Sequence, residues 1–406
     1  MINILLLFVH LFIWKRHKED RSFLITLSVT FVVFCLMAIF ILQIEVVSYN
    51  LQGTYGSDET SYYKWMILIK NGDANPSQFP APLYNLIGGL ILKISIIESV
   101  VIVRIFNVLM FSISLNLLFV ILKRRFAEYL KNNTLRFKLL YILMALNGIV
   151  VWTAIRNLKD ILFISLIIIL IYLTEATLFF KNDKIKFSTL LILYIFMFFL
   201  FQNMRPFGGI LVIIIALSIY LMRTLINGRG IMSFRFLKKR SFLLLLIIVG
   251  IVIGIRFIDF DMLSAFRKQI YTPMEIVGNT LLITILEFFR FILGPGPFNS
   301  LQQIIIGNVF VVSTKLADFL IFFGAIQWWL VLSFSFIKML NDPRFMKKII
   351  KISFDFFIIT LFIVGTYTFV YGGTGDTRLR AIMYVTSYGL IIPFLAISRK
   401  NNKNAR

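Results

Sequence analysis

The feature that most constrains this chain is a series of uncharged runs, rich in Ile, Leu and Phe, that recur along its whole length. A run of about 20 such residues can cross roughly 30 Å of hydrocarbon as an α-helix. The runs lack the strict alternation of lipid-facing β-barrel strands. Only 15% of the residues are charged, whereas soluble domains contain about a quarter. The sequence therefore predicts an all-α polytopic bundle, folded as a single integral membrane domain over residues 1–406.

The lengths of these runs predict about 10 to 11 transmembrane helices. Ten spans are expected at 22–46, 99–122, 139–155, 161–180, 187–202, 208–222, 241–258, 317–337, 352–371 and 381–397. Residues 2–14 are apolar but short, and form either an extra span or an interfacial helix. The basic segment 15–18 follows this stretch instead of preceding it, which argues against a cleaved signal peptide.

The net charge of +23 is distributed in a way that predicts orientation and not nucleic-acid binding. Cytoplasmic loops of membrane proteins carry an excess of Lys and Arg. Of the 42 basic residues, 28 lie in alternate connections, at 15–21, 123–138, 181–186, 223–240, 338–351 and 398–406. The other connections hold 12 basic and ten acidic residues, and lie at 48–98, 156–160, 203–207, 259–316 and 372–380. We therefore expect a multi-pass cell-membrane protein with the second set outside the cytoplasm.

Two of the expected external segments, 48–98 and 259–316, are too long to be simple connectors. Each contains an apolar stretch, at 82–97 and 276–294, which predicts a juxtamembrane helix. In the second segment the run Gly294 to Pro297 breaks a helix, and indicates either a cavity wall or a re-entrant turn. We expect these two segments to form the active-site face.

The most informative polar stretch is the acidic pair Asp58 and Glu59, just after the first long span. Adjacent carboxylates repel each other and lose hydration at a membrane surface, so their presence suggests proton transfer or cation binding. One of them could act as a general base, and the alternative is an ordinary solvated loop. No cofactor is predicted, although a divalent cation at this pair stays open. The single cysteine, Cys35, and two histidines near the N-terminus offer no metal-ligand cluster.

The order of features over residues 40–125 resembles membrane glycosyltransferases of the protein O-mannosyltransferase and aminoarabinose transferase type. An acidic pair after an early helix is followed by the proline-marked stretch 80–84 and by Arg104 and Asn107 at a helix start. The resemblance implies the GT-C fold, a sugar donor on a polyprenyl phosphate, Asp58 as the catalytic base and Glu59 in support. The sequence departs from relatives at Thr60-Ser61, where a basic residue is common.

Basic residues at the ends of the external segments are the candidates for binding the donor phosphate. Guanidinium groups bind phosphate oxygens in bidentate fashion and stay charged at physiological pH. The alternative is that these side chains reach lipid headgroups. The predicted phosphate-binding set is Arg104, Arg156, Lys159, Arg205, Arg378 and Arg380.

These observations predict a glycosyltransferase that moves a sugar from a polyprenyl-phosphate-linked donor to a glycan, lipid or protein acceptor outside the cytoplasm, in cell-envelope or surface polysaccharide synthesis. The expected partners are this donor and membrane lipids, with no nucleic acid. One alternative is a polysaccharide polymerase of the O-antigen or capsule type. Another is a flippase or transporter, which would use charges within spans. The charges inside or at the edges of the predicted spans are Glu45, Glu175, Arg256, Asp318 and Asp355.

Overall fold

The structure is a computed structural model of the chain that describes residues 2–48, 57–95, 98–178, 183–227, 280–306, 315–371 and 377–397. Helices cover nearly all of these residues, and no strand occurs among them. In chain order the helices are α1 Ile2–Arg16, η1 Lys18–Asp20, α2 Arg21–Ser48, α3 Ser57–Asn71, η2 Pro76–Gln78, α4 Pro82–Ile94, α5 Val100–Arg125, α6 Ala127–Leu130, α7 Thr134–Ala145, α8 Gly148–Ala154, α9 Lys159–Leu178, α10 Asp183–Gln202, α11 Gly208–Asn227, α14 Thr280–Leu293, α15 Pro297–Ile306, α16 Lys315–Asn341, α17 Pro343–Ile352, α18 Phe354–Tyr371 and α19 Thr377–Ala396.

Within the described ranges, five helices are long and apolar enough to cross a membrane, and up to seven if two bent helix pairs each count as one span. Five predicted spans coincide with these helices: 22–46, 99–122, 161–180, 317–337 and 381–397. The predicted spans 187–202 and 208–222 are helical, but their apolar parts are shorter. The predicted span 241–258 lies outside the described residues. The all-α prediction is thus confirmed, and the helices are consistent with a polytopic membrane protein.

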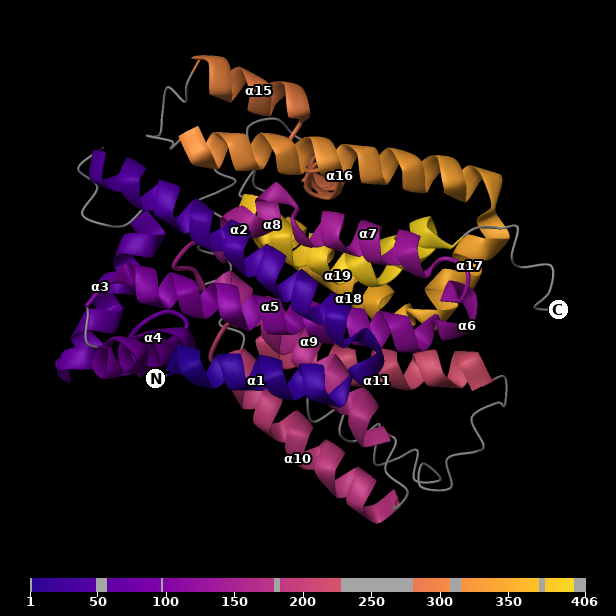
Figure 1. The fold of residues 1–406 in the computed structure, drawn as a ribbon, viewed down its shortest axis with the longest axis horizontal. Coiled ribbons are helices and arrows are strands. Elements are labelled where there is room, and N and C mark those ends of the chain that lie inside the picture. The colour runs from indigo at the N-terminus through magenta and orange to yellow at the C-terminus, as the bar shows by residue number, and fades with distance from the viewer. Residues whose placement is uncertain are drawn as a thin grey trace.

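The helices of the bundle run mostly along its long axis, so that it has two distinct ends (Figure 1). The Asp58 end carries α3 and α4, and the Arg125 end carries α6 and α17. Predicted cytoplasmic segments meet at the Arg125 end, where the Lys123 ammonium donates to the Asp20 carboxylate at 2.7 Å. There, the Lys348 ammonium lies 4.8 Å from the centre of the Tyr129 ring. Parts of three of the predicted basic segments, 15–21, 123–138 and 338–351, therefore lie at this end.

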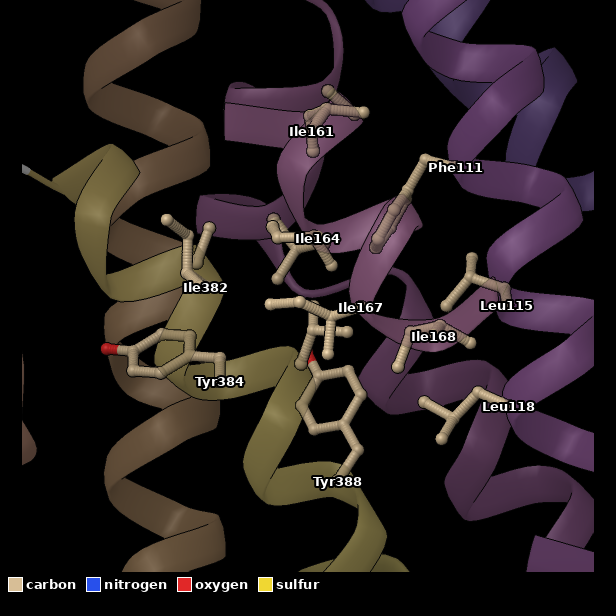
Figure 2. Packing of buried hydrophobic residues seen from close by; sticks show 14 of the residues in the cluster. Phe111, Leu115, Leu118, Ile161, Ile164, Ile167, Ile168, Ile382, Tyr384 and Tyr388 are labelled. Atoms are coloured by element: carbon tan, nitrogen blue, oxygen red, sulfur yellow. The ribbon is translucent and has the colours of Figure 1, made fainter. Parts of the chain in front are cut away.

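The centre of the bundle is formed by α5, α9 and α19. In an apolar stretch of 18 residues in each of these helices, 89%, 78% and 94% of the residues are buried. The corresponding shares are 39% for the helix that includes α2 and 28% for α16. In Figure 2, isoleucines of α9 lie between Phe111 and Leu115 of α5 on one side and Tyr384 and Tyr388 of α19 on the other. The Tyr388 hydroxyl donates to the Met144 carbonyl at 2.7 Å, so a hydroxyl inside this apolar centre has a partner. These three buried helices carry Arg104, Lys159 and Arg378, respectively, near their N-terminal ends.

The predicted span 139–155 is instead two helices, α7 and α8, bent by 54° at Leu146 and Asn147. The Asn147 side chain caps α8 by accepting from the Ile149 amide at 3.0 Å, and donates to the Gly324 carbonyl at 3.1 Å. Here α8 crosses α16 so closely that a β-carbon on Gly148 would lie 2.0 Å from the Leu320 carbonyl oxygen. The Asn147 cap and the close contact of Gly148 with α16 therefore explain why a new helix, α8, begins here.

A buried ion-pair cluster joins α5, α9 and α18 at the Arg125 end. The Arg125 guanidinium donates to Glu175 at 2.6 Å and to both oxygens of Asp355 at 2.6 and 2.7 Å. All three side chains are under 9% exposed. The transporter alternative relied on Glu175 and Asp355 as charges within spans, and the structure shows both paired with one arginine.

The helix break predicted at Gly294 separates α14 from α15. Gly294 has a φ of +77°, a conformation that favours glycine, and a β-carbon there would lie 2.4 Å from the Tyr384 hydroxyl oxygen. The Trp328 indole donates to the Ile292 carbonyl at 2.9 Å, and the Trp329 indole to the Pro295 carbonyl at 3.2 Å. The two tryptophans of α16 therefore satisfy carbonyls that the break leaves without helical partners.

Candidate functional site

The acidic pair lies in the first turn of α3, not in a loop, since this helix begins at Ser57. Carboxylates are favoured there because the helix N-terminus carries a partial positive charge. Neighbouring helix positions point about 100° apart, and the two carboxylates differ accordingly. The Asp58 side chain is 49% exposed, whereas that of Glu59 is fully buried. Of the two, only Asp58 is accessible to a substrate.

The Glu59 carboxylate is held by α5 and by the segment before α9. Arg104 donates to its two oxygens at 3.1 and 3.0 Å, and the Asn157 backbone amide donates to it at 2.6 Å. Burial would raise the pKa of Glu59, but the charges of Arg104 and Arg156 and these hydrogen bonds outweigh it and hold the pKa below its ordinary value. Glu59 is therefore ionised and fixes the start of α3 against the bundle.

Arg104 and Asn107, one helical turn apart on α5, both stabilise this end of the molecule. A third nitrogen of the Arg104 guanidinium donates to the Gln43 side chain at 3.1 Å. The Asn107 amide donates to the Arg156 carbonyl at 2.8 Å and to the Leu158 carbonyl at 3.3 Å. The pair thus anchors α3 and the segment that leads into α9. The predicted phosphate ligand Arg104 is fully buried in these contacts.

Asp58 forms an ion pair with Arg378 in the first turn of α19. The Arg378 side chain is 23% exposed, so both partners are in contact with solvent. This pair brings together residues 320 positions apart, and thereby joins the predicted base to a predicted phosphate ligand.

Lys159 and Arg205 lie beside this pair. Lys159 begins α9, and its ammonium sits 5.8 Å from the centre of the Tyr62 ring on α3. It is within electrostatic range of Arg205, Arg378 and both Asp58 and Asp160. Among the described residues, Lys159 forms neither an ion pair nor a side-chain hydrogen bond.

The Arg205 guanidinium is buried in an ion pair with Asp160 of α9. It comes from the short connection between α10 and α11 and lies 5.6 Å from the centre of the Tyr367 ring and 5.9 Å from that of Phe163. Asp160 was not among the predicted site residues, yet it fixes Arg205. The cluster at this end therefore contains three basic side chains, Lys159, Arg205 and Arg378, and the carboxylates of Asp58 and Asp160.

The two remaining predicted phosphate ligands, Arg156 and Arg380, contact other parts of the bundle. Arg156 packs its guanidinium 5.3 Å from the centre of the Trp152 ring and contributes to the field at Glu59. Arg380 is buried and donates to the Arg290 carbonyl of α14 at 3.5 Å. The structure therefore brings Asp58, Lys159, Arg205 and Arg378 together, and gives Arg380 a contact with α14.

Tyr62 is a residue of the site that was missed by sequence reasoning. It lies one turn after Asp58 on the same face of α3, is buried, and packs edge-on against Tyr84 with ring centres 5.5 Å apart. Burial raises the pKa of its hydroxyl, so Tyr62 is neutral. Tyr62 follows Asp58 by four residues, a spacing that places both on one face of a helix. This spacing becomes informative only when a helix is expected to begin before Asp58.

The part of the chain that the structure describes contains no group of three or more His, Cys, Asp or Glu side chains arranged to hold a metal ion. No protein-family model, curated protein or solved structure matches the chain. The features that bear on function are therefore the contacts and exposure of the residues at the Asp58 end.

Proposed function

We propose that this protein is a membrane glycosyltransferase that transfers a sugar from a polyprenyl-phosphate-linked donor to an acceptor on the extracytoplasmic face. The observation that carries the proposal is the half-exposed Asp58 carboxylate beside Lys159, Arg205 and Arg378. A base must be accessible to the acceptor, and a phosphate leaving group needs cations close by. The ends of α3, α9 and α19 supply both in one place.

In the proposed reaction, an acceptor hydroxyl attacks the anomeric carbon of the donor sugar. Its proton goes to the Asp58 carboxylate as the new glycosidic bond forms. The bond between the anomeric carbon and the phosphate oxygen breaks, and the polyprenyl phosphate leaves with the electron pair. Glu59, which is buried against Arg104, positions α3 and takes no part in proton transfer.

Lys159 and Arg378 are the cations best suited to the donor phosphate. Among the described residues Lys159 forms no ion pair, so a phosphate would not have to displace a carboxylate from it. Arg205 is buried with Asp160, and Arg104 with Glu59, so both support the site from behind. Of these four predicted phosphate ligands, Lys159 and Arg378 therefore remain as candidates for direct contact with the phosphate.

In the proposed reaction, Arg378 moves from one oxygen of Asp58 to the donor phosphate. An ion pair between solvent-exposed groups contributes only about 0–1 kcal/mol, so it opens easily. A bound phosphate offers Arg378 a bidentate partner of higher charge. Donor binding therefore exchanges the partner of Arg378 and frees the base, which ties proton transfer to the presence of the donor.

The test supplies purified protein with polyprenyl-monophosphate and polyprenyl-pyrophosphate sugars and follows release of the lipid carrier. The proposal expects release from the monophosphate donor by the wild type and not by Asp58→Asn. Chain growth from the pyrophosphate donor would favour the polymerase alternative. Turnover by Asp58→Asn equal to that of the wild type would exclude Asp58 as the base in either enzyme.

The sidedness of the site has its own test in intact cells. Single cysteines at positions 73 and 403 are labelled with a membrane-impermeant thiol reagent; the native Cys35 is buried in α2 and gives little background. Asp73 is exposed at the Asp58 end. We expect labelling at 73 and none at 403. Labelling at 403 alone would reverse the orientation and place the site on the cytoplasmic face.

A further inference from the structure

A stripe of basic residues runs along α17 at the Arg125 end. Arg344, Lys347, Lys348 and Lys351 follow the spacing i, i+3, i+4 and i+7, which places them on one face of a helix. All four are exposed. Phe345 and Ile349 are buried on the opposite face. The helix is therefore strongly amphipathic, with its apolar side against the bundle and its cations turned away from it.

The local geometry makes α17 a separate element and not the start of a span. The Asp342 side chain caps it by accepting from the Phe345 amide at 3.2 Å, and Pro343 occupies its first turn. It meets the following helix, α18, at an angle of 90°. If α18 forms the predicted span 352–371, α17 lies close to the plane of the membrane, as amphipathic surface helices do.

The basic stripe forms no ion pair with the residues that the structure describes. Across the described ranges, none of its four cations forms an ion pair, and Lys348 only approaches the face of the Tyr129 ring. Four cations on a surface without compensating carboxylates attract anions, and the attraction weakens as salt rises.

The last turns of α16 favour a lipid headgroup as the anion that would bind here. Phe336, Ile337 and Leu340 are 56%, 55% and 64% exposed, which fits contact with lipid acyl chains. The stripe begins four residues after Leu340, at the level where the headgroups of those lipids must lie. Clusters of four to eight Lys and Arg on an amphipathic helix at the cytoplasmic surface are typical of contacts with anionic lipids.

We infer that α17 is a binding surface for anionic phospholipid headgroups, with Arg344, Lys347, Lys348 and Lys351 as the phosphate ligands. This inference is independent of the proposed glycosyl transfer, because the stripe lies at the end of the bundle opposite Asp58 (Figure 1). An acidic protein segment is the competing occupant, and the continuity with the exposed end of α16 favours lipid.

The experiment measures binding of phosphatidylglycerol and phosphatidylcholine to the full-length protein in detergent, by native mass spectrometry and by the shift in thermal unfolding. Each Lys or Arg near an anionic surface contributes appreciably, so replacing all four α17 cations by Gln should weaken phosphatidylglycerol binding at least about tenfold. The variant Lys347→Arg, Lys348→Arg, Lys351→Arg should retain it, which separates charge from folding.

The matched control replaces four exposed cations at the same end of the molecule: Lys15, Arg16, Lys18 and Arg21. This change removes the same charge and should leave most of the phosphatidylglycerol binding intact. If both Gln variants lose phosphatidylglycerol binding equally, the binding depends on net charge and not on α17, and the inference is wrong. A wild type that binds polyglutamate but does not prefer phosphatidylglycerol would assign the stripe to an acidic protein instead.

Discussion

Helices α5 and α9 each carry charged residues near both ends, and the charged clusters at the two ends differ in their exposure to solvent. At the Arg125 end, three nitrogens of one guanidinium donate to two carboxylates, and Phe356 packs 5.1 Å from the guanidinium carbon. Every side chain in that cluster is nearly excluded from solvent. It links three helices and leaves no group exposed to a substrate.

At the Asp58 end, the same residue types form two closed pairs and one open pair. Glu59 with Arg104 and Asp160 with Arg205 are buried, whereas Asp58 with Arg378 is in contact with solvent. Lys159 adds a cation beside them. The two ends therefore contain the same residue types and differ in exposure. Under the proposed function, the exposed pair is the one that reacts, and variants at both ends test this difference.

The largest effect is expected for the base. The isosteric change Asp58→Asn removes the proton acceptor but keeps the shape of the side chain, so the rate of carrier release should fall by a factor of about 100 to 10,000. Because the Asp58 side chain is half exposed, thermal stability should stay close to that of the wild type. A loss of activity that follows only from loss of folded protein would contradict the comparison.

A change in the buried Arg125 cluster should lower stability and leave activity nearly unchanged. Arg125→Met leaves Glu175 and Asp355 buried without their cation, and breaking such a cluster costs about 3–5 kcal/mol of stability. Thermal unfolding in detergent measures the loss, and the activity of the remaining folded protein should be little changed.

Replacing the whole Arg125 cluster is the matched control. The triple variant Arg125→Met, Glu175→Met, Asp355→Leu removes both carboxylates as well and should recover most of the stability, since no buried charge is left unpaired. If the triple variant folds well but transfers no sugar, the Arg125 end takes part in function and the distinction between the two ends fails.

Lys159 should affect donor binding more than turnover. Lys159→Met removes one charge-assisted contact to phosphate, which is worth about 1.5–3 kcal/mol, so the KM for the donor should rise roughly 10- to 100-fold. Lys159→Arg should retain most of the affinity. Lys123→Met removes a partly exposed cation from the other end as a control. An unchanged KM in Lys159→Met would leave Lys159 without a role in donor binding.

Much of the fold was predictable because it depends on local composition. Span length and the alternation of basic segments follow from the sequence, and parts of three of the predicted basic segments lie at the Arg125 end. The break within 139–155 was not predicted, although Asn147 followed by Gly148 carries a recognisable helix-start signal.

The sequence could not predict which charged residues pair or how deeply each pair is buried, because the partners are far apart in sequence. Glu59 and Arg104 are 45 residues apart, and Arg125 and Asp355 are 230 residues apart. The sequence therefore grouped Arg104 with the phosphate ligands, while the three-dimensional contacts bury it against Glu59. Exposure is a property of the packed bundle, and it is the property that divides the candidate set.

The smallest effect concerns the open pair itself. Arg378→Gln removes one partner of an ion pair that is in contact with solvent, so the free energy of unfolding should change by less than about 1 kcal/mol. Arg205→Gln, the matched change in the buried pair, leaves Asp160 without its cation and should cost about 3–5 kcal/mol. Both are measured by thermal unfolding in the same detergent, and Arg378→Gln should in addition raise the KM for the donor. The exchange of Arg378 from Asp58 to a phosphate requires a pair that opens at little cost. If Arg378→Gln destabilises the protein as much as Arg205→Gln does, the pair is a structural lock, and the Asp58 end is as closed as the Arg125 end.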